Sequence, residues 1–139
     1  MRTIESLGFA EAKQMIDSIV EQVEQAGRAG VIAVVDPYGE LIAFCRMDGA
    51  PVSSIRIAMN KAYSAARERK TTEEIGKKAR DPEKGFEIAY FGDERFVGWG
   101  GGVPVWRGGQ VIGAIAVSGL PQAEDIRLAT KAAELFGGV

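Results

Sequence analysis

The sequence predicts an α+β domain in which helices pack on a central antiparallel sheet. Along the chain the apolar patterns occur in the order helix, two strands, two helices, an irregular stretch, two strands and a final helix. Each pair of strands is joined by a short turn, and strands joined in this way pair antiparallel. In a chain of 139 residues, two domains would each lack a self-sufficient core, so we expect residues 1–139 to form one domain.

The first third of the chain predicts a helix followed by a hairpin. Apolar residues recur at a spacing of three to four over residues 6–27, which is typical of an amphipathic helix. The β-branched run at residues 31–35 predicts a buried strand, and residues 41–47 return as a second strand. The intervening Asp-Pro-Tyr-Gly at residues 36–39 has turn chemistry, and we expect the Asp36 carboxylate to bond nearby backbone.

The middle of the chain predicts two helices. The first, over residues 53–69 with either serine at its start as the cap, is rich in alanine, which suggests close approach to the sheet. Thr71 and Glu74 have the spacing of a capping box that opens a shorter helix. The pattern over residues 86–96 is poor, and we expect a short helix or a loop there.

The last third predicts a second hairpin and a final helix. Residues 103–117 form the hairpin, with Gly108–Gly109 as its turn. Residues 110–117 scarcely alternate between apolar and polar, so we expect both faces of that strand to be covered. The final helix is predicted over residues 122–136, where two glycines follow as a stop signal.

Composition excludes several classes of function. The chain has no histidine, which removes histidine-dependent triads, histidine-ligated zinc and a proximal-histidine haem. With one cysteine, Cys45, we expect no internal disulfide and no metal cluster held by several cysteines. The net charge of −2 predicts no nucleic-acid partner. Early charges interrupt any leader-like stretch, and the nearly uncharged run at residues 97–117 carries an arginine and many glycines, so we expect no membrane segment and a cytoplasmic location.

The glycine-rich stretch at residues 98–104 is the strongest local signal. Consecutive glycines let backbone N–H groups converge on an anion or a flat ligand, and Gly101 and Gly102 are our candidates for this role. Neither a Walker A loop nor a dinucleotide fingerprint fits, because no Gly-Lys-Ser/Thr and no helix follow. A tight loop between strands explains the same glycines, and the residues alone leave both interpretations open.

Four polar residues complete the candidate site. Arg46 and Asp48 end a predicted strand beside a helix start, where they could line a pocket or form a solvated pair. Lys61 lies on or near the inward face of the alanine-rich helix, where it could extend to solvent or act as an acid, a base or an anion clamp. Ser118 ends the last strand, where its hydroxyl could meet a ligand or belong to an ordinary turn. We interpret Asp125 as compensation for the dipole of the final helix.

Several motifs together resemble one known family. They are Val34-Val35-Asp36 with Gly39 and Leu41, Arg46-Met47-Asp48-Gly49-Ala50, Ala58 with Lys61-Ala62 and Ala65, Gly101-Gly102-Val103-Pro104, and Gly109 with the run Val111 to Gly119 and Asp125. In this order they are similar to the GlcG/HbpS family, also called the DUF336 or haem-degrading family, which includes the C-terminal domain of PduO-type proteins. The resemblance implies a profilin-like fold and assembly as dimers or larger rings. Some members bind haem, and others accompany enzymes of small alcohol, carboxylate or aromatic catabolism.

Three functional hypotheses follow. In the first, the site binds a small carboxylate or carbonyl metabolite, and Lys61 or Asp48 acts as acid or base if turnover occurs. The second is haem or corrinoid binding, which rests on the resemblance. In the absence of histidine, the candidates for a ligand or a stacking face are Tyr38, Tyr63, Tyr90, Met47 and the two tryptophans, Trp99 and Trp106. The third is a non-enzymatic assembly or accessory protein. Because apolar residues occupy more than one sheet face, we also predict a homo-oligomer, a dimer or larger.

Overall fold

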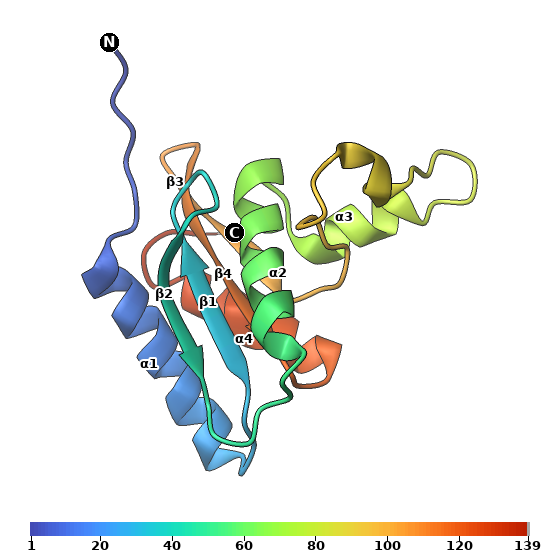
Figure 1. Cartoon of the computed structure of the whole chain (residues 1–139). Coiled ribbons are helices and arrows are strands. Elements are labelled where there is room, and N and C mark those ends of the chain that lie inside the picture. Colours follow the sequence, from blue (N-terminus) through green and yellow to red (C-terminus); the bar gives the residue numbers. More distant parts are fainter. Residues whose placement is uncertain (139) are drawn as a thin grey trace.

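Four antiparallel strands form the centre of the fold, in the order β2-β1-β4-β3 (Figure 1). The computed structural model describes residues 1–138. In chain order the elements are α1 (Phe9–Gln25), β1 (Val31–Val35), β2 (Leu41–Arg46), α2 (Ser54–Glu68), α3 (Thr72–Ala79), the 3₁₀ turn η1 (Ile88–Phe91), β3 (Gly102–Arg107), β4 (Gln110–Ser118) and α4 (Gln122–Ala133). The α+β class, the central antiparallel sheet and both hairpins are confirmed.

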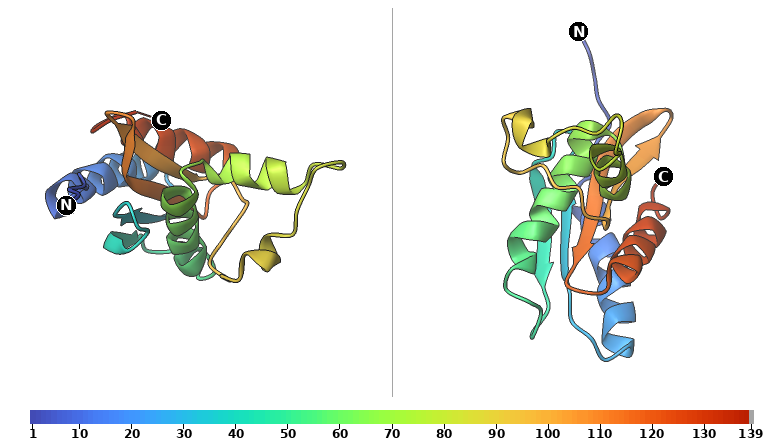
Figure 2. Two further views of the ribbon diagram at one scale, coloured as in Figure 1. Left: turned by 90° about the horizontal axis from the view of Figure 1, so that it is seen from above. Right: turned by 90° about the vertical axis from the view of Figure 1, so that its right-hand side faces the viewer.

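Helices cover both faces of the sheet. In the left view of Figure 2, α1 and α4 lie on one face and α2 on the other. On the α1 and α4 face the core is built from large side chains, among them Met15, Ile19, Ile32, Val34, Val105, Ile115, Val117 and Leu128. On the α2 face the core consists mainly of small side chains, namely Val31, Ala33, Val35, Ala58, Ala62, Ala65, Ala66, Ala114 and Ala116. Since alanine fills little space, α2 packs close to the strands, as its composition predicts.

The register places three residues in one row across the sheet. Val31 of β1 lies opposite Arg46 of β2 and opposite Ser118 of β4. Directly paired residues point to the same face, and Val31 packs in the core beneath α2. The Arg46 and Ser118 side chains therefore also point to the α2 face, with one strand between them. Residues 111–118 of β4 are buried throughout, which confirms that both faces of that strand are covered.

Turn and cap chemistry is largely as predicted. The Asp36 carboxylate accepts hydrogen bonds from the N–H groups of Tyr38 and Glu40, at 2.8 and 3.0 Å. The Thr71 hydroxyl accepts one from the N–H of Glu74 at 3.1 Å, which caps α3. At the start of α2, Ser53 occupies the N-cap position but its side chain makes no capping hydrogen bond.

The outer helices are shorter than predicted, for reasons that lie far away in the sequence. We expected the first helix to begin at residue 6, but the Leu7 N–H pairs with the carbonyl of Ile112 at 2.8 Å, so α1 begins at Phe9. The final helix was expected to reach residue 136. It ends at Ala133, because the chain turns back and Gly138 pairs with Trp106 of β3.

A long irregular segment, residues 80–101, joins α3 to β3 and is tied to α2. The Val97 N–H donates to the Ser64 hydroxyl at 2.9 Å, and the Tyr63 hydroxyl donates to Asp93. The Arg95 guanidinium lies 4.0 Å from the centre of the Tyr63 ring. These contacts hold the segment beside α2, as its position in Figure 1 indicates. Within residues 1–138, no helix is both long and apolar enough to cross a membrane.

Candidate functional site

Lys61 and Asp125 form a buried ion pair. The Lys61 Nζ lies 3.3 Å from Oδ2 of Asp125 and 3.1 Å from the backbone carbonyl of Val117. Each of the two side chains is only 4% exposed. The other carboxylate oxygen of Asp125 accepts the Leu120 N–H at 3.2 Å. Both charges are therefore compensated, as charges removed from water must be.

A cavity of 230 Å³ opens beside this pair, between the start of α4 and the end of β4. Its lining includes Lys61, Asp125, Ser118, Gly119, Trp99 and Ile57. An ammonium group has three N–H donors, and two of those on Lys61 have acceptors among residues 1–138. The Ser118 hydroxyl makes no hydrogen bond within residues 1–138, and because no fully buried side-chain N or O atom there lacks a partner, this hydroxyl is open to the cavity that Ser118 lines. The cavity thus presents a cation and a hydroxyl with unused hydrogen-bonding capacity.

Burial shifts the pKa of both members of the pair towards their neutral forms. It lowers the pKa of Lys61 below its ordinary value, and the Asp125 charge opposes this only in part. It raises the pKa of Asp125 to about 6, against the opposing effects of the Lys61 ammonium and the Leu120 N–H. The two groups are therefore closer to exchanging a proton near neutral pH than an exposed lysine and aspartate would be.

The glycine-rich loop packs directly over the pair. A Cβ atom on Gly101 would lie 2.8 Å from Nζ of Lys61 and 2.6 Å from the Val117 carbonyl, and Gly101 has a φ of +128°. A Cβ on Gly102 would meet the Lys61 backbone at 2.5 Å. Close packing therefore requires both glycines. The Gly102 N–H already donates to the Thr72 hydroxyl at 2.9 Å, so this amide has a partner inside the protein.

The structure brings together some of the predicted site residues and not others. Lys61 and Ser118 line the cavity, and Gly101 lies against Lys61. Arg46 and Asp48 are exposed and do not line this cavity. Arg46 shares a row with Ser118, but two strand spacings separate their Cα atoms, about 10 Å.

Asp125 is the site residue that the sequence analysis missed. We interpreted it as dipole compensation for the final helix; it lies in the first turn of α4, but it is buried against Lys61. A signal was present in its spacing. Asp125 precedes the buried Leu128, Ala129 and Ala132 by three, four and seven residues, so it lies on the inward stripe of the helix.

Comparisons with known proteins give consistent matches across the chain. Residues 7–134 match the family model described as haem degrading protein HbpS-like. An uncharacterized 15.0 kDa protein from the dhaT-dhaS intergenic region of Citrobacter freundii is 35% identical over 133 residues, which cover 96% of this chain and 94% of that protein.

Two solved structures are similar in fold. A crystal structure of the Klebsiella pneumoniae protein ORFY has a TM-score of 0.90 at 34% identity, covering 98% of this chain and 94% of the other. A crystal structure of a PduOC complex with haem has a TM-score of 0.84 at 27% identity, covering 92% and 93% of the two chains.

Proposed function

The chain belongs to the HbpS-like family, and from that premise and the buried Lys61–Asp125 pair we propose that it binds a small carboxylate or carbonyl metabolite in the adjoining cavity. The observation that carries the proposal is the third N–H of Lys61, which has no acceptor within residues 1–138. A carboxylate or carbonyl oxygen supplies the acceptor that this donor lacks. The Ser118 hydroxyl and the Trp99 ring, both in the lining, add a second polar contact and a flat apolar wall.

The same pair suits proton transfer on a bound carbonyl compound. Lys61 binds the substrate oxygen and stabilises negative charge that develops there. Asp125, whose pKa burial raises to about 6, takes up or releases a proton near neutral pH. Asp48, our other acid or base candidate, is exposed and does not line the cavity, so the proposal assigns this role to the buried pair.

A thermal-shift screen of small carboxylates and carbonyl compounds, such as acetate and pyruvate, tests the proposal. A ligand that raises the Tm of the wild type should lose its effect in Lys61→Met, and should bind about tenfold more weakly in Ser118→Ala, where one hydrogen bond is removed. Lys131→Met is the matched control, because Lys131 is exposed on α4 away from the cavity. Circular dichroism checks that each variant is folded. Unchanged shifts in both Lys61→Met and Ser118→Ala would remove this cavity from consideration.

Asp48→Asn separates this proposal from the alternative site at the end of β2. The variant alters an exposed side chain outside the cavity, so ligand-induced shifts should be retained. If Asp48→Asn abolishes binding while Ser118→Ala does not, the ligand sits beside Arg46 and Asp48 instead.

Haem is the second candidate, and the similarity to a haem-complexed PduOC structure is the observation that favours it. The residues present do not fit it well. The chain has no histidine, Met47 is packed in the core, and the Tyr63 hydroxyl is engaged by Asp93. Tyr38 and Tyr90 are 56% and 87% exposed, so neither offers a buried axial ligand. Titration with hemin should give no Soret shift beyond that of a histidine-free control protein; a larger shift would restore haem as the ligand.

A further inference from the structure

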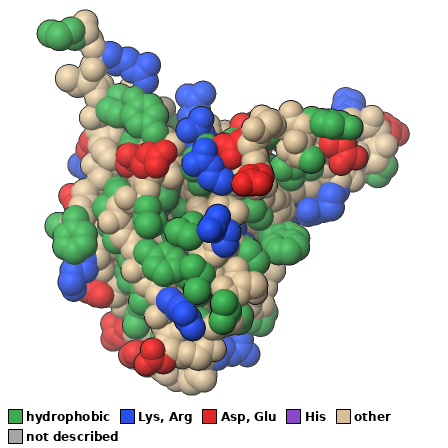
Figure 3. All heavy atoms as spheres, viewed as in Figure 1, with side chains coloured by type: hydrophobic (Ala, Val, Ile, Leu, Met, Phe, Trp, Pro, Cys, Tyr) green, Lys and Arg blue, Asp and Glu red, His purple; other side chains and the backbone are tan. Residues whose placement is uncertain are grey.

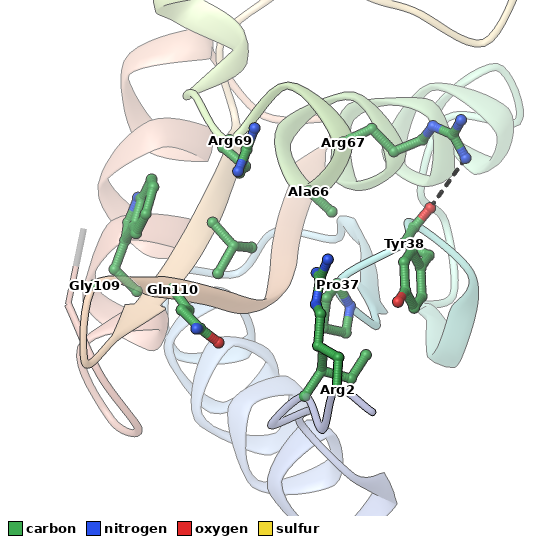
Figure 4. A pocket seen from close by; sticks show the side chains of 11 residues that line it. Arg2, Pro37, Tyr38, Ala66, Arg67, Arg69, Gly109 and Gln110 are labelled. Carbon is green, nitrogen blue, oxygen red and sulfur yellow. Dashed lines mark hydrogen bonds between the residues drawn. The ribbon is translucent and has the colours of Figure 1, made fainter.

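A second cavity, of 410 Å³, lies at the C-terminal end of α2, beside Arg69, whose backbone is in the left-handed conformation (Figure 4). Four separate segments surround it: the N-terminal residues, the turn between β1 and β2, the C-terminal end of α2, and the β3–β4 hairpin. None of the residues that line it belongs to the Lys61 cavity.

Three arginines line this cavity without a carboxylate among them. Arg2 comes from the N-terminal segment, and Arg67 and Arg69 come from the end of α2. None of the three forms an ion pair within residues 1–138, and no acidic residue lines the cavity. Glu5, in the same N-terminal segment as Arg2, is already paired with Arg107 at 3.1 Å. The cavity therefore gathers three positive charges with no internal compensation.

The placement of these arginines goes beyond what the helix requires. Cations near the C-terminus of a helix interact favourably with the helix dipole, and this accounts for the basic residues at the end of α2. It does not account for Arg2, which reaches the cavity from another segment, as Figure 4 shows. The Arg67 guanidinium donates to the Tyr38 carbonyl at 3.4 Å, whereas the guanidinium groups of Arg2 and Arg69 make no hydrogen bond within residues 1–138.

Arg69 also occupies an unusual backbone conformation. Its φ and ψ are +55° and +40°, and it is the only residue other than glycine with a positive φ in the described chain. At this position, one residue past the end of a helix, glycine is the usual choice because a Cβ atom is unfavourable there. Strained residues of this kind cluster at ligand-binding sites, and the Arg69 side chain lines the cavity.

Aromatic and apolar side chains complete the lining. Trp106 is half-buried, the Tyr38 ring is exposed, and Val111 and Ile4 add apolar surface. Flat rings of this kind stack on unsaturated ligands, and guanidinium groups bind carboxylate and phosphate oxygens in pairs. We propose that this cavity binds an organic anion with at least two negative charges on a flat unsaturated body, such as an aryl phosphate or an aromatic dicarboxylate.

The two tryptophans allow the two cavities to be read separately. Trp99 lines the Lys61 cavity and Trp106 lines the arginine cavity. In a Trp99→Phe protein, the remaining fluorescence reports the arginine cavity, and in a Trp106→Phe protein it reports the Lys61 cavity. Binding in the arginine cavity is therefore measured independently of binding in the Lys61 cavity.

Phenyl phosphate and phthalate are the probes, with benzyl alcohol as the neutral control. At least one of the two anions should change the Trp106 fluorescence saturably, and benzyl alcohol should not. Comparison of the two identifies phosphate or carboxylate as the preferred group. Inorganic phosphate should bind more weakly than phenyl phosphate; equal affinities would overturn the assignment of a flat body.

Arg69→Gly gives the sharpest test, because it removes the guanidinium and places glycine, which adopts a positive φ without strain, at this position. We expect a higher Tm and an affinity for the probe that is about tenfold lower. Lys131→Met, which removes an exposed cation elsewhere, should leave the affinity unchanged. Arg69→Asn, which also tolerates the left-handed conformation, serves if the glycine variant does not fold. An unchanged affinity in the folded Arg69 variant, or no saturable change with either anion, would overturn the proposal.

Discussion

Lys61 on α2 and Asp125 on α4 lie 3.3 Å apart although the two helices cover opposite faces of the sheet. The pair connects the two layers next to Gly101, the residue that precedes β3. Because Gly101 has no side chain, the ammonium and carboxylate can meet there, covered by protein except where they line the cavity. The candidate site thus also links the helices on the two faces of the sheet.

The first prediction concerns the stability that depends on this pair. Lys61→Met leaves a buried carboxylate without its partner and should lower the free energy of unfolding by about 3–5 kcal/mol. The double variant Lys61→Met/Asp125→Leu should lose less, since it removes both charges together. Urea denaturation measures the free energy of unfolding of the double variant and of the two single variants, Lys61→Met and Asp125→Leu. The hypothesis of a tightly coupled pair is wrong if the double variant is destabilised by the sum of the two single changes.

The second prediction is a pH dependence carried by Asp125. Its pKa in the folded protein is about 6, above the ordinary value of 3.8, so the folded state holds this proton more tightly than the unfolded state. The resulting stabilisation is complete below about pH 4 and is lost as the pH rises through about 6. In total it amounts to about 3 kcal/mol.

The measurement is the difference in unfolding free energy between the wild type and Asp125→Asn, from pH 4 to pH 7. This difference should fall as the pH rises and level off above pH 6. Asp93 acts in the opposite sense, because Arg95 and Tyr63 hold its pKa below the ordinary value, but it contributes equally to both proteins. A flat difference across this range would contradict the raised pKa of Asp125.

The third prediction tests the packing of the glycine loop. In Gly101→Ala the new methyl group would meet Nζ of Lys61 and the Val117 carbonyl, so the protein should lose about 3 kcal/mol or more of stability. Gly92→Ala is the matched control, because Gly92 also has a positive φ, +74°, but open space around it. It should lose only about 1 kcal/mol. Similar losses in the two variants would mean that backbone conformation alone explains the requirement for glycine.

The fourth prediction concerns the irregular segment between α3 and β3. Ser64→Ala removes the hydroxyl that accepts the Val97 N–H, and hydrogen exchange at Val97 should become markedly faster. Amides in the middle of β4 should exchange as slowly as in the wild type, since they do not depend on this contact. Unchanged exchange at Val97 would show that other contacts hold the segment.

The fifth prediction is that the protein forms a homo-oligomer. Helix α2 packs on β1, β3 and β4, and hydrophobic side chains reach the surface on the side shown in Figure 3. Leu41, the first residue of β2, and Val52, which precedes α2, are 50% and 70% exposed. Light scattering at micromolar concentration should give at least twice the chain mass of 14.9 kDa. A mass near 15 kDa would contradict the prediction. An oligomer whose Lys61 cavity is filled by a neighbouring copy would favour an accessory role over ligand binding.

The sequence predicted the fold well because its signals are local. The turn at residues 36–39, the two-glycine turn and the alanine-rich helix each depend on neighbours along the chain, and each is present. The predicted start of α1 and the predicted end of α4 were wrong, because contacts with the distant residues Ile112 and Trp106 determine where these helices begin and end.

The candidate site was predicted only in part, for the same physical reason. Lys61 could be identified from its position on an inward helix face, but its partner Asp125 lies 64 residues away. No local pattern links the two. We predicted Arg46 and Asp48 as site residues because they lie at a strand end near a helix start. In the sheet, however, β1 lies between β2 and β4, so Arg46 and Asp48 do not reach the cavity at the end of β4.

The unequal margins of the sheet bear on how the protein could aggregate. On β3, Pro104 has no N–H to donate to a new strand. The backbone N–H and carbonyl of Trp106 are already hydrogen-bonded to the backbone of Gly138, at 2.7 and 2.9 Å. On β2, residues 41–46 contain no proline, and β1 is their one strand partner within residues 1–138. A foreign strand can therefore add at one margin only. Growth by strand addition to the native sheet would therefore stop after two copies joined through β2, for as long as Gly138 stays paired with Trp106.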